Sequence, residues 1–344
     1  MTRNIIILGA GASKADGAPL QKEIFIEYVK QFKLGNIPRR ISSTINPFLK
    51  NFFGIDVDEP KIESKNYPTF EEVLGVLEIA DKRDEYFRES ILTKRSLIQM
   101  KKYLIDLIAI VLDKSLSSHY GEYHHFNLIK RLKEEKILQK TTFISFNYDI
   151  IIDNIIIQAF FGEINYGIED RYHYSNPDGP IRLYKLHGSL NWLFCPYCNY
   201  LNLGGNIKTA AERAYNPNKV CYVCGEKNLE PLIIPPTYFK SMGNFYIQKI
   251  WHEVDSSLRD ADTIFLCGYS LPEADIHIKY LLKKAELFNR NKLLSFYIIN
   301  GKKSSEQAEE ERKRFRGFFR NKRGITFTDL TFEEFSKYGI KNRY

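Results

Sequence analysis

The chain lacks most of the features that mark membrane-spanning, secreted and low-complexity proteins. It has no apolar run of the length that a bilayer requires, no internal repeat and no low-complexity segment. No cationic segment followed by an apolar stretch and a small-residue cleavage site opens the sequence, so we expect no signal peptide. Only five of the 344 residues are cysteine, and nothing indicates an oxidising compartment. We therefore expect a cytoplasmic protein that does not associate with a membrane.

The bulk composition excludes a disordered chain but does not select a partner. Apolar residues make up 44% of the sequence and aromatic residues 14%, which is enough to build a core. The length suits one large domain or two modest ones. The formal net charge of +8 would suit an anionic ligand or a nucleic acid. That charge is small for this length, and we interpret it as a solvated surface.

The first recognisable unit is the stretch Asn4–Ser13, NIIILGAGAS. Four consecutive apolar residues predict a buried strand, and two glycines then allow a tight turn before a helix expected over 19–32. Strand, glycine turn and helix form the phosphate-binding unit of dinucleotide folds, because N–H groups at a helix start bind anions. Lys14 stands where a third glycine is usual, so a plain tight turn is the alternative interpretation.

Five strand-like runs each end in small or polar residues. The runs are Ile5–Leu8, Thr141–Phe146, Ile181–Leu186, Thr263–Cys267 and Leu294–Ile299. They are followed in turn by Gly9–Ser13, Asn147–Asp149, His187–Ser189, Gly268–Ser270 and Asn300–Gly301. Helical stretches separate several of the runs, as a parallel sheet requires. Because such sheets bind ligands outside the carboxyl ends of their strands, the pattern predicts an α/β, Rossmann-like fold with a site at this edge. The preference of turns for Gly, Asn and Ser is the alternative explanation.

A mainly helical insertion is expected over residues 33–140. Apolar residues recur at helical spacing over 70–77 and again over 104–111. Thr69 is a candidate N-cap, with Glu72 three residues later as its capping-box partner. The run of helices is too long for an ordinary crossover between two strands.

The sharpest local signal is a pair of C-x-x-C motifs, Cys195/Cys198 and Cys221/Cys224, separated by 22 residues. Four thiolates with this spacing suit a tetrahedral Zn²⁺ site, and we predict a small zinc-binding module over 190–230. Four thiolates fill the coordination sphere, so the metal would be structural. Two disulfides or free thiols are the alternative. The fifth cysteine lies alone in an apolar strand and is expected to be a small core residue.

Taken in order, these motifs resemble the sirtuin (Sir2-like) family. The resemblance spans residues 5–300 and rests on Gly9-Ala-Gly-Ala-Ser13, Phe146-Asn147-Tyr148-Asp149, Leu186-His187-Gly188-Ser189, the four cysteines, Gly268-Tyr-Ser-Leu271 and Ile299-Asn300. No single motif decides the matter, but the ordered set is specific. It implies NAD as the substrate, bound across a Rossmann-like sheet, and cleavage of the bond between nicotinamide and ribose.

The resemblance also implies a role for each site residue. The pyrophosphate would be held by Gly9, Ala10, Gly11 and Ser13. Asn147 and Asp149 would contact the nicotinamide ribose and position a water or a hydroxyl, while His187 would act as general base through a ribose hydroxyl. The adenosine half would lie against Gly268, Ser270 and Asn300. For His187, a hydrogen-bonded buried histidine is the alternative, and His124 and His125 are expected to be surface or packing residues.

Two segments depart from the pattern of protein-deacylating sirtuins. The loop Lys14–Leu20 lacks the Phe-Arg pair of the family's G-I-P-D-F-R-like loop over the nicotinamide pocket. The segment Leu232–Phe239 stands where deacylases carry an F-G-E-like strand that pairs with the peptide, and its two prolines cannot donate ladder hydrogen bonds. The sequence therefore departs from the peptide-binding half of the pattern, whereas the half that cleaves NAD is intact.

With its helical insertion, the chain looks more like the Sir2-like proteins of bacterial anti-phage systems. That resemblance implies hydrolysis of NAD to ADP-ribose and nicotinamide, which depletes the cell of NAD on infection. It also implies a homo-oligomer and a separate partner, such as a HerA-like ATPase. An NAD-dependent protein deacylase and a non-catalytic NAD- or ADP-ribose-binding scaffold are the alternative functions.

The stretch 312–323 carries seven basic residues interleaved with phenylalanines. Such a composition can bind nucleic acid. We interpret it instead as an amphipathic helix whose phenylalanine face packs on the body of the protein. A final strand and helix are expected over 325–335.

Overall fold

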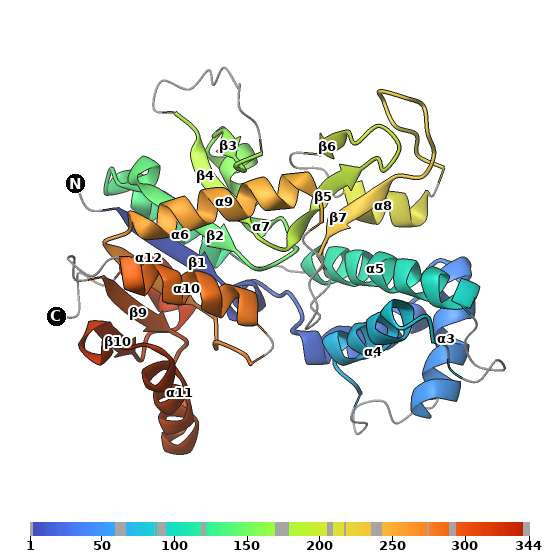
Figure 1. The fold of residues 1–344 in the computed structure, drawn as a ribbon, viewed down its shortest axis with the longest axis horizontal. Helices are drawn as coiled ribbons and strands as arrows, with labels where there is room; N and C mark the ends of the chain where they lie inside the picture. The colour runs from blue at the N-terminus through green and yellow to red at the C-terminus, as the bar shows by residue number, and fades with distance from the viewer. Residues whose placement is uncertain are drawn as a thin grey trace. The chain divides into compact units, whose positions relative to one another are not determined.

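The structure is a computed structural model of the 344-residue chain (Figure 1). It describes all residues except 1–2, 59–66, 86, 88–93, 118–121, 169–178, 205–208, 217, 235–242, 274, 289–293 and 340–344. The described residues form two compact units. Unit 1 comprises Met1–Asp16, Tyr120–Gly188 and Ser241–Tyr344, and unit 2 comprises Gly17–His119 and Ser189–Lys240.

Unit 1 is built on a seven-stranded parallel sheet in the order β10-β9-β8-β1-β2-β4-β3. Its strands are β1 (Asn4–Leu8), β2 (Thr141–Ser145), β3 (Ile164–Asn165), β4 (Ile181–Lys185), β8 (Thr263–Cys267), β9 (Ser295–Ile299) and β10 (Ile325–Thr328). The five strand-like runs of the sequence all form strands of this sheet, so the predicted α/β class with a parallel sheet is confirmed. Strand β1 lies between β2 and β8. The strands that follow β1 in the sequence first extend the sheet on the β2 side and then, from β8 on, on the other side. The carboxyl ends of the strands beside β1 therefore form a switch point of the kind that binds ligands in open sheets.

The helices of unit 1 explain why its central strands are apolar without alternation. They are α1 (Ala10–Ala15), α6 (His124–Glu134), η2 (Leu138–Lys140), α7 (Ile151–Asn154), η3 (Ile155–Ala159), α9 (Phe245–Arg259), α10 (Ile276–Phe288), α11 (Ser305–Phe318), η4 (Lys322–Gly324) and α12 (Phe332–Tyr338). Helices α9 and α10 lie side by side in Figure 1, and α6 packs on α12. Ile5 to Leu8 are almost fully buried, as expected for a strand covered on both faces.

The carboxyl-terminal stretch follows the amphipathic interpretation. Helix α11 buries Phe315, and Phe319 just beyond it is buried as well. Its arginines and lysines are mostly exposed. The predicted final strand and helix are β10 and α12, and the α12 N-cap Thr331 forms a capping box with Glu334.

Unit 2 joins a helical part to a small antiparallel sheet. Its elements are η1 (Gln21–Glu23), α2 (Ile24–Lys33), α3 (Arg39–Phe53), α4 (Phe70–Lys82), α5 (Lys94–Ser117), β5 (Gly188–Phe194), β6 (Leu201–Leu203), α8 (Thr209–Tyr215) and β7 (Glu230–Ile233). The three strands form a sheet in the order β6-β5-β7. Thr69 caps α4 as predicted, since its hydroxyl accepts from the Glu72 N–H and the Glu72 carboxylate accepts from the Thr69 N–H.

A buried ion cluster ties the two parts of unit 2 together. Asp106 on α5 is 2% exposed and pairs with Arg40 on α3 and Arg213 on α8. Arg40 also donates to the backbone oxygen of Ala214. Burial, with a further contribution from the Arg40 charge, lowers the pKa of Arg213 to about 10. The element that follows the first cysteine pair is thus anchored to the helical part.

Among the described residues, no helix is both long and apolar enough to cross a bilayer. The longest, α5, carries lysines and two aspartates along its length.

Candidate functional site

The turn after β1 packs directly against the turn after β8. The Gly9 N–H donates to Cys267 O and the Gly11 N–H donates to Gly268 O, each at 2.9 Å. A Cβ added at Gly9 would lie 2.6 Å from Gly268 O, and one added at Gly11 would lie 2.8 Å from Gly268 Cα. Gly268 has a φ of +63°, and its own Cβ would lie 2.2 Å from Ala12 N. The three glycines therefore have a packing reason that is independent of any ligand, and two of the amides expected near a phosphate are engaged within the protein.

A hydrogen-bonded cluster links this turn to the end of β2. The Asn147 Nδ2 donates to Gly9 O at 2.9 Å and to the Ser13 Oγ at 2.7 Å. The Ser13 hydroxyl donates in turn to the Asp149 Oδ2 at 2.6 Å, and the Ile151 N–H donates to the Asp149 Oδ1. Ser13 and Asp149 are 3% and 5% exposed. The fold thus brings together residues that are at least 134 positions apart in the sequence, at the carboxyl ends of neighbouring strands.

His187 follows β4, the next strand of the sheet. Its Nδ1 lies 3.0 Å from Phe146 O, an atom that can only accept, so Nδ1 carries the proton and Nε2 is the basic nitrogen of the neutral ring. The rings of Phe146 and Tyr148 flank the imidazole at centroid distances of 5.8 and 6.4 Å. The side chain is 5% exposed. The structure therefore holds this imidazole in one orientation among aromatic rings.

A buried ion pair contacts the backbone of Asp149, and the sequence did not predict this pair. Lys185 and Asp153 are both fully buried, and their Nζ and Oδ2 atoms are 3.1 Å apart. The Lys185 ammonium also donates to the backbone oxygen of Asp149, and the Tyr166 hydroxyl donates to the Asp153 Oδ1 at 2.6 Å. The signal that could have revealed the pair is a lysine inside the otherwise apolar end of the run IRLYKL.

The residues expected at the adenosine half lie at the ends of β8 and β9. The Asn300 Nδ2 donates to Tyr269 O at 3.0 Å and to the Glu311 Oε1 at 2.6 Å. The backbone oxygen of Ser270 accepts from the Arg314 Nη1 at 2.8 Å, and its side chain is exposed. Both segments are thus held by side chains of α11.

One of the two histidines assigned to surface or packing roles is part of a buried pair. His125 is 1% exposed and its ring Nδ1 binds the carboxylate of Asp16, which is fully buried. The Asp16 carboxylate also accepts the N–H groups of His124 and His125 at the start of α6. Burial by itself would raise the pKa of Asp16, but these hydrogen bonds and the His125 ring outweigh it and lower the pKa below 3.8.

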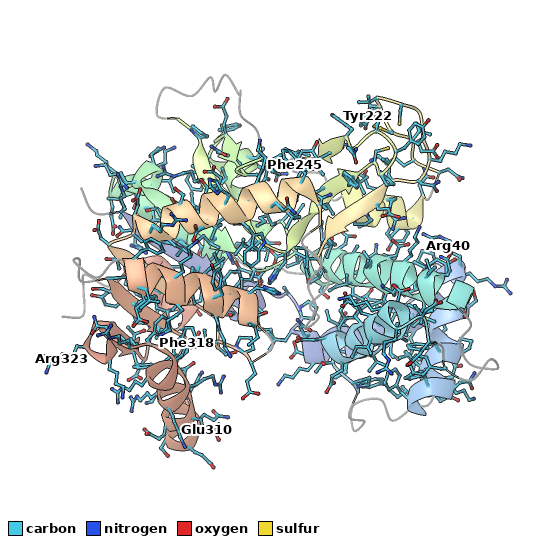
Figure 2. All side chains as sticks on the ribbon, in the orientation of Figure 1. Arg40, Tyr222, Phe245, Glu310, Phe318 and Arg323 are labelled. Atoms are coloured by element: carbon cyan, nitrogen blue, oxygen red, sulfur yellow. The ribbon has the colours of Figure 1, made fainter. Side chains whose placement is uncertain are left out.

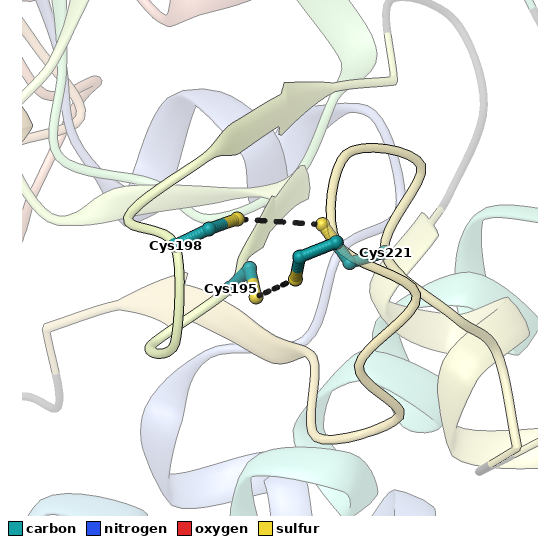
Figure 3. Close-up of side chains that lie close together, drawn as sticks. Cys195, Cys198 and Cys221 are labelled. Atoms are coloured by element: carbon teal, nitrogen blue, oxygen red, sulfur yellow. Dashed lines mark hydrogen bonds between the residues drawn. The ribbon is translucent and has the colours of Figure 1, made fainter.

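The four predicted metal ligands meet in unit 2. The Sγ atoms of Cys195, Cys198, Cys221 and Cys224 all lie within 4.8 Å of one another. The Cys195 Sγ lies 3.6 Å from the Cys224 Sγ, and the Cys198 Sγ lies 3.7 Å from the Cys221 Sγ. Dashed lines mark these contacts in Figure 3, where Cys195, Cys198 and Cys221 are labelled. Four thiolates about 2.3 Å from a zinc ion in a tetrahedron would lie about 3.8 Å apart, so the cluster fits that ion.

The pKa values within the cluster differ. The Cys224 N–H donates to the Cys221 sulfur and lowers the pKa of Cys221 to about 7. The pKa values of Cys198 and Cys224 are raised, by burial and by the neighbouring sulfurs. None of the four cysteines forms a disulfide, which removes one alternative interpretation of the motif. Cys267, the fifth cysteine, is fully buried in β8 as predicted, and burial raises its thiol pKa far above the usual value.

A cavity of about 360 Å³ lies elsewhere in unit 1, at the end of β3. It is lined by Asn165, Gly167 and the first turns of α9, including Lys249 and His252. No sequence-predicted site residue is among its lining residues.

No protein-family model matches the chain, and no curated protein sequence is similar to it at a significant level. Among solved structures, a Sir2 enzyme is 13% identical over 98% of this chain and 91% of that chain, with a TM-score of 0.45. Sir2Tm bound to a propionylated peptide is 12% identical over 97% and 90%, with a TM-score of 0.43. A Sir2–p53 peptide–NAD+ complex is 12% identical over 97% and 90%, with a TM-score of 0.42. At these values the similarity is distant, and chemistry proposed for this chain has to come from its own residues.

Proposed function

We propose that this protein is a Sir2-like hydrolase that cleaves the nicotinamide–ribose bond of NAD+ to give ADP-ribose and nicotinamide. The observation that carries the proposal is the cluster of Ser13, Asn147 and Asp149 at the ends of adjacent parallel strands, with His187 at the end of the next strand. The ordered sequence motifs that resemble the sirtuin family coincide with these strand ends.

The reaction requires polar groups of the kinds found at the carboxyl edge of the sheet. Departure of nicotinamide leaves positive charge on the ribose carbon, an oxocarbenium-like state of the kind found in glycoside cleavage. Nicotinamide is a good leaving group, so no acid is needed to protonate it. An oriented water and a base of suitable pKa are needed instead.

Asn147 is the residue that would orient the water. Its Nδ2 is used by Gly9 O and Ser13, which fixes the amide and presents Oδ1 as an acceptor for a water or a ribose hydroxyl. Asp149 is buried and both of its carboxylate oxygens accept hydrogen bonds, so it would act by holding Ser13 and, through it, Asn147. His187 would supply the base through Nε2, because Nδ1 is committed to Phe146 O.

The rest of the dinucleotide would lie along the same edge, toward β8 and β9. The Gly9–Ser13 turn would contact the pyrophosphate by the close approach that glycine allows, and Gly268, Ser270 and Asn300 would lie by the adenosine half. Zinc held by the four cysteines would stabilise unit 2 and take no part in the chemistry, since no coordination position would remain open.

The physiological part of the proposal is NAD+ depletion in anti-phage defence, by a homo-oligomer or together with a separate partner such as a HerA-like ATPase. It is motivated by the helices of residues 17–119 and by the missing Phe-Arg pair in Lys14–Leu20. The segment expected to replace the peptide-pairing strand, Leu232–Phe239, lies mostly outside the described residues.

The proposal is tested by NAD+ consumption with purified full-length chain and no acyl peptide. The wild type should release nicotinamide and ADP-ribose. Asn147→Ala and His187→Ala should each lower turnover by about 100-fold or more, because an oriented nucleophile or a base contributes that much. The exposed His252 gives a matched control, and His252→Ala should keep full activity.

The alternatives predict different results in the same assay. Turnover that requires an acyl peptide and yields O-acyl-ADP-ribose would make the protein a deacylase. Binding of NAD+ that stays uncleaved with acyl peptide and with candidate partners present would make it a scaffold. Equal activity in the wild type, Asn147→Ala and His187→Ala would refute the assigned site.

A further inference from the structure

The positive charge of this protein is concentrated in one segment. The whole chain has a formal net charge of +8, and residues 312–323 carry +7 of it, which leaves +1 for the rest of the chain. We call residues 312–323 the basic segment. It contains no acidic residue, and its cations are Arg312, Lys313, Arg314, Arg316, Arg320, Lys322 and Arg323. A net charge that is small when averaged over the chain therefore makes one surface strongly cationic.

Packing holds the backbone of the basic segment on unit 1. Phe315 and Phe319 are buried, and the ring of Phe319 lies 4.4 Å from that of Phe296 on β9. The Asn321 N–H donates to the Glu286 Oε1 at 2.7 Å. The cations are thus carried by a backbone that is already ordered, and a ligand would not have to order it on binding.

The cations themselves face solvent. All seven are exposed. Arg314 donates to the backbone oxygen of Ser270, and Arg316 lies over the Phe327 ring at 5.7 Å. The side chains of the other five form no hydrogen bond or ion pair with any residue that the structure describes. Like charges at this spacing repel one another, so the arrangement costs stability until an anion neutralises it.

The macrodipole of α11 explains only part of this charge. The first half of the helix is acidic and its last turn is basic, which is the favourable distribution. Figure 2 labels Glu310 in the acidic half and Arg323 beyond the end of the helix. The helix ends at Phe318, so its dipole gives no reason for the three cations that follow it, Arg320, Lys322 and Arg323.

We infer that the basic segment is a docking surface for the phosphate backbone of a nucleic-acid duplex. Five of its seven cations are arginines, whose planar guanidinium groups can each donate two parallel hydrogen bonds to phosphate oxygens. A duplex presents about one negative charge per 1.7 Å of its length, which matches a dense array of cations. This docking is independent of the proposed NAD+ chemistry.

The phenylalanines of the basic segment favour a duplex over a single strand or a membrane. Two of them are buried, and the third, Phe318, is half-buried with its ring centroid 4.8 Å from the Lys283 Nζ. Single strands stack their bases on exposed rings, and interfacial helices insert apolar side chains into the bilayer. Exposed cations without exposed rings leave contacts to phosphate, which do not depend on base sequence.

The experiment measures binding of a labelled DNA duplex of about 30 base pairs to the full-length protein by fluorescence anisotropy. Five cations without an internal partner predict a slope of about −4.5 for log affinity against log salt concentration. The affinity should therefore fall by about 500-fold between about 50 and 200 mM salt. Absence of binding at the lower concentration, or a slope shallower than about −2, would overturn the inference.

The triple variant Arg320→Gln/Lys322→Gln/Arg323→Gln assigns the binding to this segment. It removes three cations that lie beyond α11 and leaves the helix itself unchanged. The slope should become less negative by about 3, and the affinity at about 50 mM salt should fall by about 100-fold or more. Wild-type affinity in this variant would refute the assignment.

Lys130→Gln/Lys136→Gln/Lys140→Gln is the matched control. These lysines are exposed, belong to unit 1 and lie in a stretch that also contains Glu134 and Glu135. The control makes the same change in net charge and should alter the affinity by less than about threefold, because screening limits the effect of distant charges. Equal losses in the two triple variants would mean that only net charge matters. Thermal unfolding verifies that both variants are folded.

Competition distinguishes the duplex from other polyanions. The competitors are the corresponding single strand, phosphatidylserine vesicles and poly-glutamate, each at the same concentration of negative charge as an unlabelled duplex. The unlabelled duplex should displace the labelled one, whereas each of the other three should displace less than about half of it, because the duplex has the highest density of phosphate. Stronger displacement by any of the three than by the duplex would overturn the inference and identify the preferred partner.

Discussion

The two units both bury charged side chains, but they use them differently. In unit 1, Lys185 pairs with Asp153 and donates to the backbone oxygen of Asp149, in the segment after β2. Asn147 of the same segment donates to Gly9 O at the carboxyl edge of the sheet. In unit 2, Asp106 joins three helices through two arginines, and four cysteines gather beside the small sheet. The first arrangement orders polar groups at the ends of strands, whereas the second links helices that also pack through an apolar core.

The difference follows from the elements available to each unit. A seven-stranded parallel sheet buries long apolar runs and needs no further support, so it can place polar residues at the strand ends. The three-stranded sheet of unit 2 is smaller, and a metal held by the cysteine cluster would add to its stability. Buried charge is therefore evidence for a site only where it borders a surface that a ligand can reach.

Metal removal is the largest expected effect and concerns unit 2 alone. A chelator, or Cys221→Ser, should abolish protection of the β5–β7 amides from hydrogen exchange, because structural zinc contributes on the order of 10 kcal/mol to such modules. Protection of β1 and β2 should remain. Elemental analysis should find one zinc per chain in the wild type and in Cys267→Ala, whose thiol lies outside the cluster. Unchanged β5–β7 protection in metal-free protein would contradict the comparison.

Gly268→Ala is the largest expected effect of a substitution in unit 1. A Cβ would lie 2.2 Å from Ala12 N at a φ of +63°, so we expect a loss of about 4 kcal/mol from backbone strain and overpacking together. Urea unfolding measures it. Gly317→Ala in α11 is the control, since no described atom lies within 4 Å of the added carbon, and it should gain up to about 1 kcal/mol. A cost below 1 kcal/mol for Gly268→Ala would refute the packing account of the turns.

Lys185→Met should cost about 3 kcal/mol, because it leaves Asp153 buried without its cation. The double variant Lys185→Met/Asp153→Leu should recover much of that stability, since neither charge remains. If the pair also orders the Asp149 turn, the recovered double variant should still be defective in NAD+ turnover. Full activity in a stable double variant would show that the pair is structural, like Asp106 in unit 2.

Asp16→Asn has the smallest expected effect, about 2 kcal/mol at pH 7, the scale of hydrogen bonds to a charged group. The folded-state pKa of Asp16 is lowered, so its stabilisation is complete above the unfolded value of 3.8 and is lost as the pH falls through the folded value. Unfolding free energies measured from pH 6 down to pH 2 should converge for the wild type and the variant at the acid end. A constant difference across this range would exclude the carboxylate as the cause.

Much of the fold and part of the site could be predicted from sequence because local patterns specify them. The apolar run of β1, the Thr69 capping box and the cysteine spacing each express physics that acts over a few residues. The Lys185–Asp153 pair could not be predicted in this way. A lysine in a strand is read as solvent-facing unless its partner is known, and that partner lies on another element.

The glycine turn after β1 is a second case in which the sequence alone did not reveal the tertiary partners. Its two glycines suggested phosphate binding, and their N–H groups turned out to be used by the end of β8. Only the strand order makes Gly268 the neighbour of Gly9 and Gly11. The phenylalanine spacing of α11 likewise predicts an amphipathic helix but does not reveal that Glu311 and Arg314 hold groups at the ends of β9 and β8.

The sequence by itself determined the class of fold, the edge of the sheet where polar residues gather and the four cysteines that meet in one cluster, because periodicity, turn chemistry and cysteine spacing are local properties. The tertiary structure alone decided which polar atoms are satisfied inside the protein and which have no hydrogen-bond partner among the described residues, the Asn300 Oδ1 among them. That outcome depends on partners from distant parts of the chain, and a hydrogen bond exists only where folding brings donor and acceptor within about 3 Å.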